Sequence, residues 1–301
     1  QAVAPGVELV TAADHEAAVR AATGADAVIG YCSAEILAAG ERLEWIQILS
    51  AGAERCVTIP AVRDRGLLIT NAQRIYGPEI AEHVIAMLYA FSRGLYRYIP
   101  EQLEGRWNRN AVPRDRMWEL DGRTMFVVGL GGIGTEVARR AHALGMRVVA
   151  TRRSSRSGPE FVDYVGLADE FGELAAEADV IVNAAPLTPE TTGMFDAAFF
   201  SRMKPTAYFI NIGRGRSVVT DDLVAALEAG ELAGAGLDVT DPEPLPQGHP
   251  LWGLPNVIIT PHVAGSSVEA VERQRTLVRE NLRRYVAGEP MLSVVDVDRG
   301  Y

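Results

Sequence analysis

A glycine-rich turn between two apolar runs constrains the fold of this chain more than any other feature. Gly129, Gly131 and Gly134 form a GxGxxG pattern that follows the β-type run 125–128 and opens a helical stretch, and a second β-type run comes at 147–150. This order predicts a βαβ unit. The first glycine permits a tight turn, the second admits a pyrophosphate, and the third lets helix and strand pack closely. The N–H groups at the start of the helix would face the phosphates. We therefore expect a dinucleotide-binding fold.

The rest of the chain alternates short β-type runs with helical runs, which is typical of parallel sheets in α/β layers. A polar stretch at 105–121 has the composition of a linker. We expect two doubly wound parallel-sheet domains, a substrate domain at 1–95 plus 270–301 and a dinucleotide-binding domain at 96–269. Residue 1 is Gln rather than Met, so a further strand is expected before it.

The predicted elements follow from these runs. Strands are expected at 7–10, 27–31, 45–49, 67–70, 125–128, 147–150, 161–165, 180–183, 208–211, 235–239 and 257–260. Helices are expected at 14–22, from Pro78 onward, at 221–229 and at 267–286, the last returning to the first domain. Thr220 is the expected N-cap of the helix at 221–229, and Gly230 follows its end.

Composition narrows the class of partner. The formal net charge of −10 argues against nucleic acid or an anionic membrane as the main partner. No apolar run approaches the roughly 18 residues of a membrane span, and no leader pattern opens the sequence, so a cytoplasmic protein is expected. Cys32 and Cys56 form no CxxC motif, and we expect them to be thiols in a reducing compartment rather than a disulfide or a metal site.

The remaining candidates have structural interpretations. His15, His83, His142 and His249 make no HxH or HExxH pattern, so no metal site is expected. His83 and His142 fall in helical runs and are expected to be packing or surface residues, and His249 is expected to be structural in its loop. Trp107, Trp118 and Tyr76 are equally compatible with lining a substrate pocket and with ordinary core packing.

The end of the second strand bears on the cofactor. An NAD enzyme places Asp or Glu there, about 20 residues after the glycines, to bind the ribose 2′-hydroxyl. This chain has Thr151, Arg152 and Arg153 instead. Guanidinium groups bind a 2′-phosphate well, so the sequence predicts a preference for NADP(H), with NAD(H) possible. The alternative, two solvated surface arginines, stays open.

Three reactive side chains each follow the end of a later strand. Arg214, Glu243 and His262 come shortly after the runs that end near 211, 239 and 260. In a parallel sheet the carboxyl ends of the strands share one edge, where ligands bind. Histidine suits proton exchange near neutral pH, a carboxylate orients it, and arginine holds a substrate carboxylate through two parallel hydrogen bonds. The three residues predict hydride transfer between a nicotinamide and a 2-hydroxy or 2-oxo acid.

Several motifs in a fixed order resemble the D-2-hydroxyacid dehydrogenase family over residues 45–301. They are GLGGIG at 129–134, PLTPETTG at 186–193, NIGRG at 211–215, GLDVTDPEPLP at 236–246 and TPHVAG at 260–265. The resemblance implies a flavodoxin-like substrate domain, a Rossmann NAD(P)-binding domain, an active site in the cleft between them, and a homodimer.

The resemblance also assigns roles to residues. Arg214 would bind the substrate carboxylate, Glu243 would support His262, and His262 would be the acid/base. Asp238 would lie near the nicotinamide. Backbone N–H groups of the loop Ser50, Ala51 and Gly52 would contact the substrate. The expected cofactor contacts are Gly129, Leu130, Gly131, Gly132, Ile133, Gly134, Thr151, Arg152, Arg153, Ala185, Pro186, Thr191, Ile212, Gly213, Arg214, Asp238 and His262.

The leading hypothesis is a reductase of small 2-oxo acids, glyoxylate and hydroxypyruvate first among them. Val219 stands where many members have Asp or Asn, and with the Thr-Arg-Arg segment this is similar to the NADPH-using glyoxylate/hydroxypyruvate reductase branch. It disfavours the phosphoglycerate dehydrogenase branch. A nucleotide-sensing corepressor of the same fold stays an alternative, whereas the order of Arg214, Glu243 and His262 argues against another Rossmann enzyme such as an alanine dehydrogenase.

Overall fold

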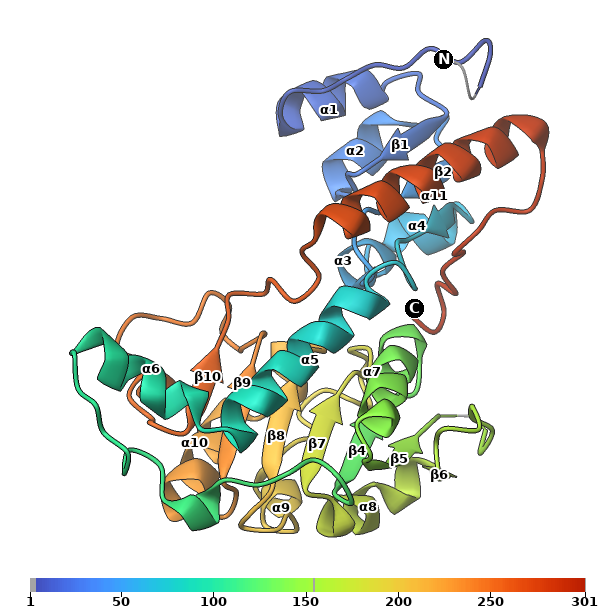
Figure 1. The fold of residues 1–301 in the computed structure, drawn as a ribbon. Helices are drawn as coiled ribbons and strands as arrows, with labels where there is room; N and C mark the ends of the chain where they lie inside the picture. Colours follow the sequence, from blue (N-terminus) through green and yellow to red (C-terminus); the bar gives the residue numbers. More distant parts are fainter. Residues whose placement is uncertain (1–3, 154, 301) are drawn as a thin grey trace. The chain divides into compact units, whose positions relative to one another are not determined.

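The computed structural model describes residues 4–153 and 155–300, which divide into two compact units (Figure 1). The first unit runs to Tyr76 and resumes at Ser267, and the second is Gly77–Ser266. Helix α5 (Gly77–Ser92) therefore belongs to the second unit, although the expected boundary at 95 assigned it to the first. It packs against α7 (Gly132–Ala143), and the Arg140 guanidinium of α7 contacts the Glu82 carboxylate of α5 at 3.3 Å.

The first unit is a small parallel sheet with helices around it. Its strands are β1 (Ala27–Ile29), β2 (Trp45–Gln47) and β3 (Leu68–Thr70), paired in that order. Its helices are α1 (His15–Ala22), α2 (Ala34–Ala39), α3 (Glu54–Val57), α4 (Pro60–Asp64) and α11 (Val268–Ala287). The strand expected at 7–10 is wrong: that segment lies at the surface, where Leu9 and Val10 stay 57% and 68% exposed, and it pairs with no described strand.

A buried polar network ties the last helix to this sheet. The Trp45 indole N–H donates to the Thr70 hydroxyl, which donates in turn to Gln47 Oε1 at 2.9 Å. Asn281 of α11 donates to the same Gln47 oxygen at 2.8 Å and is itself fully buried. The network gives these buried groups the hydrogen-bond partners that burial requires. The expected return of the last helix to the first domain is confirmed.

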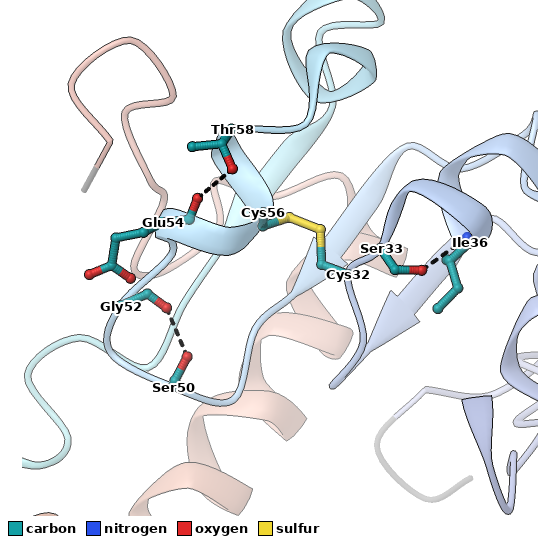
Figure 2. The surroundings of a disulfide bond; sticks show 8 residues. All are labelled: Cys32, Ser33, Ile36, Ser50, Gly52, Glu54, Cys56 and Thr58. Atoms are coloured by element: carbon teal, nitrogen blue, oxygen red, sulfur yellow. Dashed lines mark hydrogen bonds between the residues drawn. A yellow bond between two sulfur atoms is a disulfide. The ribbon is translucent and has the colours of Figure 1, made fainter. Parts of the chain in front are cut away.

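The two cysteines are joined, which corrects the expectation of free thiols. Cys32 follows β1, Cys56 lies in α3, and their Cα atoms are 5.5 Å apart in a disulfide (Figure 2). The residues are 24 positions apart in sequence, but the parallel pairing of β1 with β2 brings the chain segments after both strands to the same edge of the sheet. The CxxC motif identifies only cysteines that are close in sequence, so it could not predict a disulfide between two cysteines that the fold brings together.

The second unit contains a seven-stranded parallel sheet in the order β10-β9-β8-β7-β4-β5-β6 (Figure 1). Each of the seven strands expected after residue 120 has a counterpart, but the one expected at 161–165 begins only at Tyr164. They are β4 (Thr124–Val128), β5 (Arg147–Thr151), β6 (Tyr164–Gly166), β7 (Val180–Asn183), β8 (Tyr208–Asn211), β9 (Gly234–Leu237) and β10 (Val257–Ile259). Strands β5 and β6 are added on one side of β4, and strands β7 to β10 on the other side. The boundary between β4 and β7 is therefore the topological switch point, where doubly wound sheets bind dinucleotides.

The other elements of the second unit cover this sheet or connect its strands. The helices are α5, α6 (Leu95–Leu103), α7, α8 (Phe171–Glu177), α9 (Ala197–Phe200) and α10 (Thr220–Ala229). Short 3-10 turns lie at Arg114–Arg116, Ala168–Glu170, Gly215–Ser217 and Pro250–Trp252. Thr220 is not an N-cap: it lies inside α10, and its hydroxyl donates to the carbonyl of Asp241 at 2.7 Å. Gly230 ends α10 with φ 73°, as expected.

No helix in the described part of the chain combines the length and the apolar character that crossing a membrane would require.

Candidate active site

The glycine loop after β4 has the geometry of a pyrophosphate cradle. Gly129 has φ 92°, and a Cβ there would lie 2.8 Å from Ala185 Cα. A Cβ at Gly134 would lie 2.1 Å from the Gly129 carbonyl oxygen, so α7 can approach β4 only without a side chain. A Cβ at Gly131 would meet nothing within 4 Å, which leaves open space in front of the first turn of α7. The residues present therefore fit a bound dinucleotide at this helix N-terminus.

The side chain of Arg152 is hydrogen-bonded to two backbone carbonyl groups. Its Nε donates to the Leu130 carbonyl at 3.0 Å and its Nη1 donates to the Ser157 carbonyl at 2.9 Å. The guanidinium thus fastens the glycine loop to the segment after β5. Arg153 is exposed at the end of the same strand. Arg152 therefore holds the glycine loop, whereas Arg153 lies at the surface. Hydrogen bonds from Thr188 and the backbone lower the pKa of the Glu190 carboxyl group, and Arg153 lies close enough to lower it further.

A buried amide network positions the loop that carries Arg214. Asn183 at the end of β7 donates to Asn211 Oδ1 at 2.9 Å and to the Ser217 hydroxyl at 2.8 Å. Ser217 and Asn211 both donate to the Arg214 carbonyl. Sequence reasoning missed Asn183 and Ser217. The available signal was a polar residue at the end of an otherwise apolar strand run, since a buried amide must find partners.

The Arg214 loop and the Glu243 loop approach each other closely. A Cβ at Gly215 would lie 1.9 Å from the carbonyl oxygen of Thr240, so only glycine fits there. Arg214 is half-buried, and its Nη1 donates to the Gly213 carbonyl at 2.8 Å. Strands β8, β9 and β10 are neighbours in the sheet, so the loops that follow them begin about 5 Å apart from one strand to the next.

His262 and Glu243 form a hydrogen-bonded pair. Nδ1 of His262 lies 2.7 Å from Oε1 of Glu243, and the two side chains are 49% and 43% exposed. A carboxylate only accepts hydrogen bonds, so Nδ1 carries the proton and Nε2 is the nitrogen left for proton exchange with a ligand. This arrangement suits a general acid/base whose orientation is held by its carboxylate partner.

Asp238 holds the loop on which His262 lies. It is 3% exposed, and its carboxylate accepts from the Thr260 hydroxyl at 2.6 Å and from the N–H groups of Val263 at 2.9 Å and Ala264 at 3.0 Å. The His262 N–H donates to the Asp238 carbonyl at 2.8 Å, and His262 adopts φ 55°. A non-glycine residue at positive φ is uncommon and persists only where its surroundings fix it. Here Asp238 supplies that fixation.

In the first unit, hydrogen bonds to the three carbonyl groups of Ser50, Ala51 and Gly52 hold this loop in place. Asn71 donates to the Ala51 carbonyl at 2.7 Å, and the Ala72 N–H donates to the Ser50 carbonyl at 2.9 Å. Figure 2 shows the third hydrogen bond, in which the Ser50 hydroxyl donates to the Gly52 carbonyl at 2.8 Å. Within residues 4–153 and 155–300, the N–H groups of Ala51 and Gly52 donate to no acceptor. They are the kind of group that binds a carboxylate.

The other candidate residues have mostly structural positions. Trp118 stacks on Tyr208 with ring centroids 5.6 Å apart, whereas Trp107 is 91% exposed. The Tyr76 hydroxyl donates to the Leu49 carbonyl at 2.6 Å. His249 accepts from the Leu251 N–H in the turn before Trp252, which is a structural role, as expected.

Comparison with known proteins identifies the family of this chain. Residues 85–264 match the family described as D-isomer specific 2-hydroxyacid dehydrogenase, NAD binding domain. The human glyoxylate reductase/hydroxypyruvate reductase is 37% identical over 257 residues, covering 85% of this chain and 78% of that protein. The chain belongs to the D-isomer specific 2-hydroxyacid dehydrogenase family. As a member of it, the protein is an NAD(P)-dependent oxidoreductase.

Two further relatives place the chain within the family. The NADPH-dependent glyoxylate/hydroxypyruvate reductase from Sinorhizobium meliloti, solved in complex with NADP and sulfate, superimposes with a TM-score of 0.86 at 30% identity over 100% of this chain and 94% of that one. The D-3-phosphoglycerate dehydrogenase of Mycobacterium leprae is 35% identical over 94% of this chain but only 51% of its own length.

Proposed function

We propose that this protein reduces small 2-oxo acids, glyoxylate and hydroxypyruvate first among them, with NADPH as the hydride donor. The observation that carries the proposal is the His262–Glu243 pair at 2.7 Å, on the same sheet edge as the glycine loop and the Arg214 loop. The names of the human and Sinorhizobium relatives support the choice of substrates.

Each protein group has one task in this mechanism. The bound dinucleotide supplies the hydride. Arg214 binds the substrate carboxylate through paired hydrogen bonds and polarises the neighbouring carbonyl. His262 gives the proton on Nε2 to the carbonyl oxygen as C2 is reduced, and Glu243 stabilises the positive charge of the imidazolium before transfer. The N–H groups of Ala51 and Gly52 also bind the substrate carboxylate.

The preference for NADPH rests on the end of β5. Strand β5 ends at Thr151 and is followed by Arg152 and Arg153, so the Asp or Glu that binds a ribose 2′-hydroxyl in NAD enzymes is not found at this strand end. Arg153 binds the phosphate, whereas Arg152 keeps Leu130 and the glycine loop in place. Replacing Arg153 by Ala should therefore raise the KM for NADPH and leave the KM for NADH nearly unchanged. Replacing Arg152 by Ala should impair use of both cofactors.

The direct test is a substrate panel. Purified protein is mixed with NADPH or NADH and with glyoxylate, hydroxypyruvate, pyruvate or phosphohydroxypyruvate, and the decline of nicotinamide absorbance is followed. The proposal predicts the highest kcat/KM with NADPH and one of the first two acids. A higher kcat/KM with phosphohydroxypyruvate would favour the phosphoglycerate dehydrogenase-like alternative. Binding of NADPH with no turnover of any acid would favour a corepressor-like sensor.

We further propose a homodimer whose interface includes one face of α6. Leu95, Ile99 and Leu103 follow at helical spacing and are 46%, 53% and 80% exposed, and Trp107 beyond the helix is also exposed. A row of exposed large apolar side chains is typical of a protein contact. Light scattering should give twice the mass of the chain, and the double variant I99E/L103E should give a monomer.

The cytoplasm is the proposed location, because a reductase needs the intracellular pool of reduced dinucleotide. A structural disulfide such as Cys32–Cys56 is uncommon in that compartment. Cell fractionation tests the location: the protein should be recovered with the cytoplasmic fraction, and its recovery elsewhere would contradict the proposal.

A further inference from the structure

A histidine of helix α5, His83, contacts the loop that carries His262, residues 260–264, which is called the catalytic loop below. His83 is a half-buried residue of α5 whose Nε2 lies 3.0 Å from the Thr260 hydroxyl oxygen and 3.8 Å from Asp238 Oδ1. Thr260 comes two residues before His262, and Asp238 accepts the N–H groups of the two residues that follow His262. His83 therefore meets the catalytic loop at the hydroxyl that fixes its beginning.

The proton count defines the direction of these hydrogen bonds. A threonine hydroxyl has one proton, and Thr260 gives it to Asp238 Oδ1 at 2.6 Å because a carboxylate cannot donate. The 3.0 Å contact between His83 and Thr260 then needs its proton from the imidazole. Nε2 of His83 is the protonated nitrogen, and the order of donation runs from His83 to Thr260 to Asp238.

We propose that His83 is a positioning residue for the reaction, acting through Thr260 and Asp238 on the orientation of His262. The inference rests on the proposed function. A donor on the lone pair of Thr260 keeps the hydroxyl proton directed at Asp238, and consecutive hydrogen bonds polarise and strengthen one another. Asp238 in turn holds the backbone on both sides of His262, which keeps its positive φ. The sequence alone suggested only packing or a surface position for His83.

Matched substitutions separate this role from simple packing. Leucine at position 83 fills the space without a donor, whereas glutamine places an amide N–H near the position of Nε2. We expect H83L to lower kcat about tenfold, the size of one lost hydrogen bond, with little change in the KM for NADPH. H83Q should restore most of kcat. H142L, an exposed histidine change on α7, is the control and should match the wild type.

A double-mutant cycle tests the route through Thr260. If His83 acts through the hydroxyl, H83L should cost little further activity in a T260V background, so the two effects should be strongly non-additive. Additive losses, or an H83L enzyme with wild-type kcat, would overturn the inference. So would an H83Q variant as impaired as H83L when both fold normally.

A spectroscopic measurement tests the geometry without using activity. Long-range ¹H–¹⁵N spectra of the imidazole, recorded where the ring is neutral, should show His83 with the proton on Nε2 and a bare Nδ1. The opposite tautomer would contradict the proposed order of donation. Absence of turnover in the wild type would remove the proposed function but would leave this tautomer result to decide the arrangement of His83, Thr260 and Asp238.

Discussion

The Nδ1 atom of His262 lies 2.7 Å from the Oε1 atom of Glu243, and the two residues come from loops that follow adjacent strands, β10 and β9. The contact fixes the tautomer of the imidazole, because the carboxylate can only accept. It leaves Nε2 as the atom that exchanges a proton with the substrate oxygen.

Replacing Glu243 separates its charge from its hydrogen bond. Gln at this position still accepts from Nδ1–H but carries no charge, whereas Leu removes both. We expect E243Q to lose about a hundredfold in kcat for 2-oxo acid reduction, in the range of general acid–base effects, and E243L to lose more. NADPH binding, measured by fluorescence, should match the wild type in both. Equal activity of all three enzymes would show that the pair is not part of catalysis.

Alanine substitutions at two glycines of the GxGxxG motif should have different effects, one on stability and the other on cofactor binding. A Cβ at Gly134 would lie 2.1 Å from the Gly129 carbonyl, so G134A should lower the melting temperature of the unliganded protein. A Cβ at Gly131 meets open space, so G131A should fold with wild-type stability and bind NADPH more weakly, because the methyl group enters the pyrophosphate position. Calorimetry and cofactor titration of both variants check this, and unchanged binding by G131A would contradict the cradle.

The Cys32–Cys56 bond should contribute to the stability of the first unit. It closes a loop between residues 24 positions apart, for which chain entropy gives about 3.5 kcal/mol. The variant C32S/C56S should therefore melt at a lower temperature than the oxidised wild type. A reducing agent should lower the melting temperature of the wild type and leave that of the variant unchanged. Two titratable thiols in the unfolded wild type without reductant would disprove the bond.

An ion-pair cluster near the end of α11 should make the melting temperature of the protein depend on pH in the acid range. Hydrogen bonds from Arg283 and Arg284 lower the pKa of Glu280 from its ordinary 4.5 to about 2. A carboxyl group with a lowered pKa stabilises the folded state above its unfolded pKa, and this contribution is lost as the pH falls from about 4.5 towards 2. The wild type should melt above E280Q at pH 7, and the difference should vanish near pH 2. Because Glu280 is at the surface, the difference should be small and should shrink in high salt.

Much of the second unit could be predicted from sequence because its signals are local. Apolar strand runs, the GxGxxG turn and the Gly230 helix end each depend on a few neighbouring residues. The hydrogen bond of Thr220 to Asp241 was missed because a partner elsewhere in the chain competes with local capping. The Cys32–Cys56 bond and the His83–Thr260 contact were missed for the same reason, since both join residues that only the sheet topology brings together. The hydrogen bonds of Arg152 to the Leu130 and Ser157 carbonyls were missed because no local sequence pattern signals them.

The most direct test of the account is the reduction of glyoxylate and hydroxypyruvate by an H262Q variant, measured as NADPH oxidation beside the wild type. The glutamine removes the proton donor and keeps a side chain of similar size. We predict a loss of kcat of about a hundredfold or more with NADPH affinity unchanged. Turnover within a few-fold of the wild type, with the best 2-oxo acid, would contradict the assignment of His262 as the acid of this reductase.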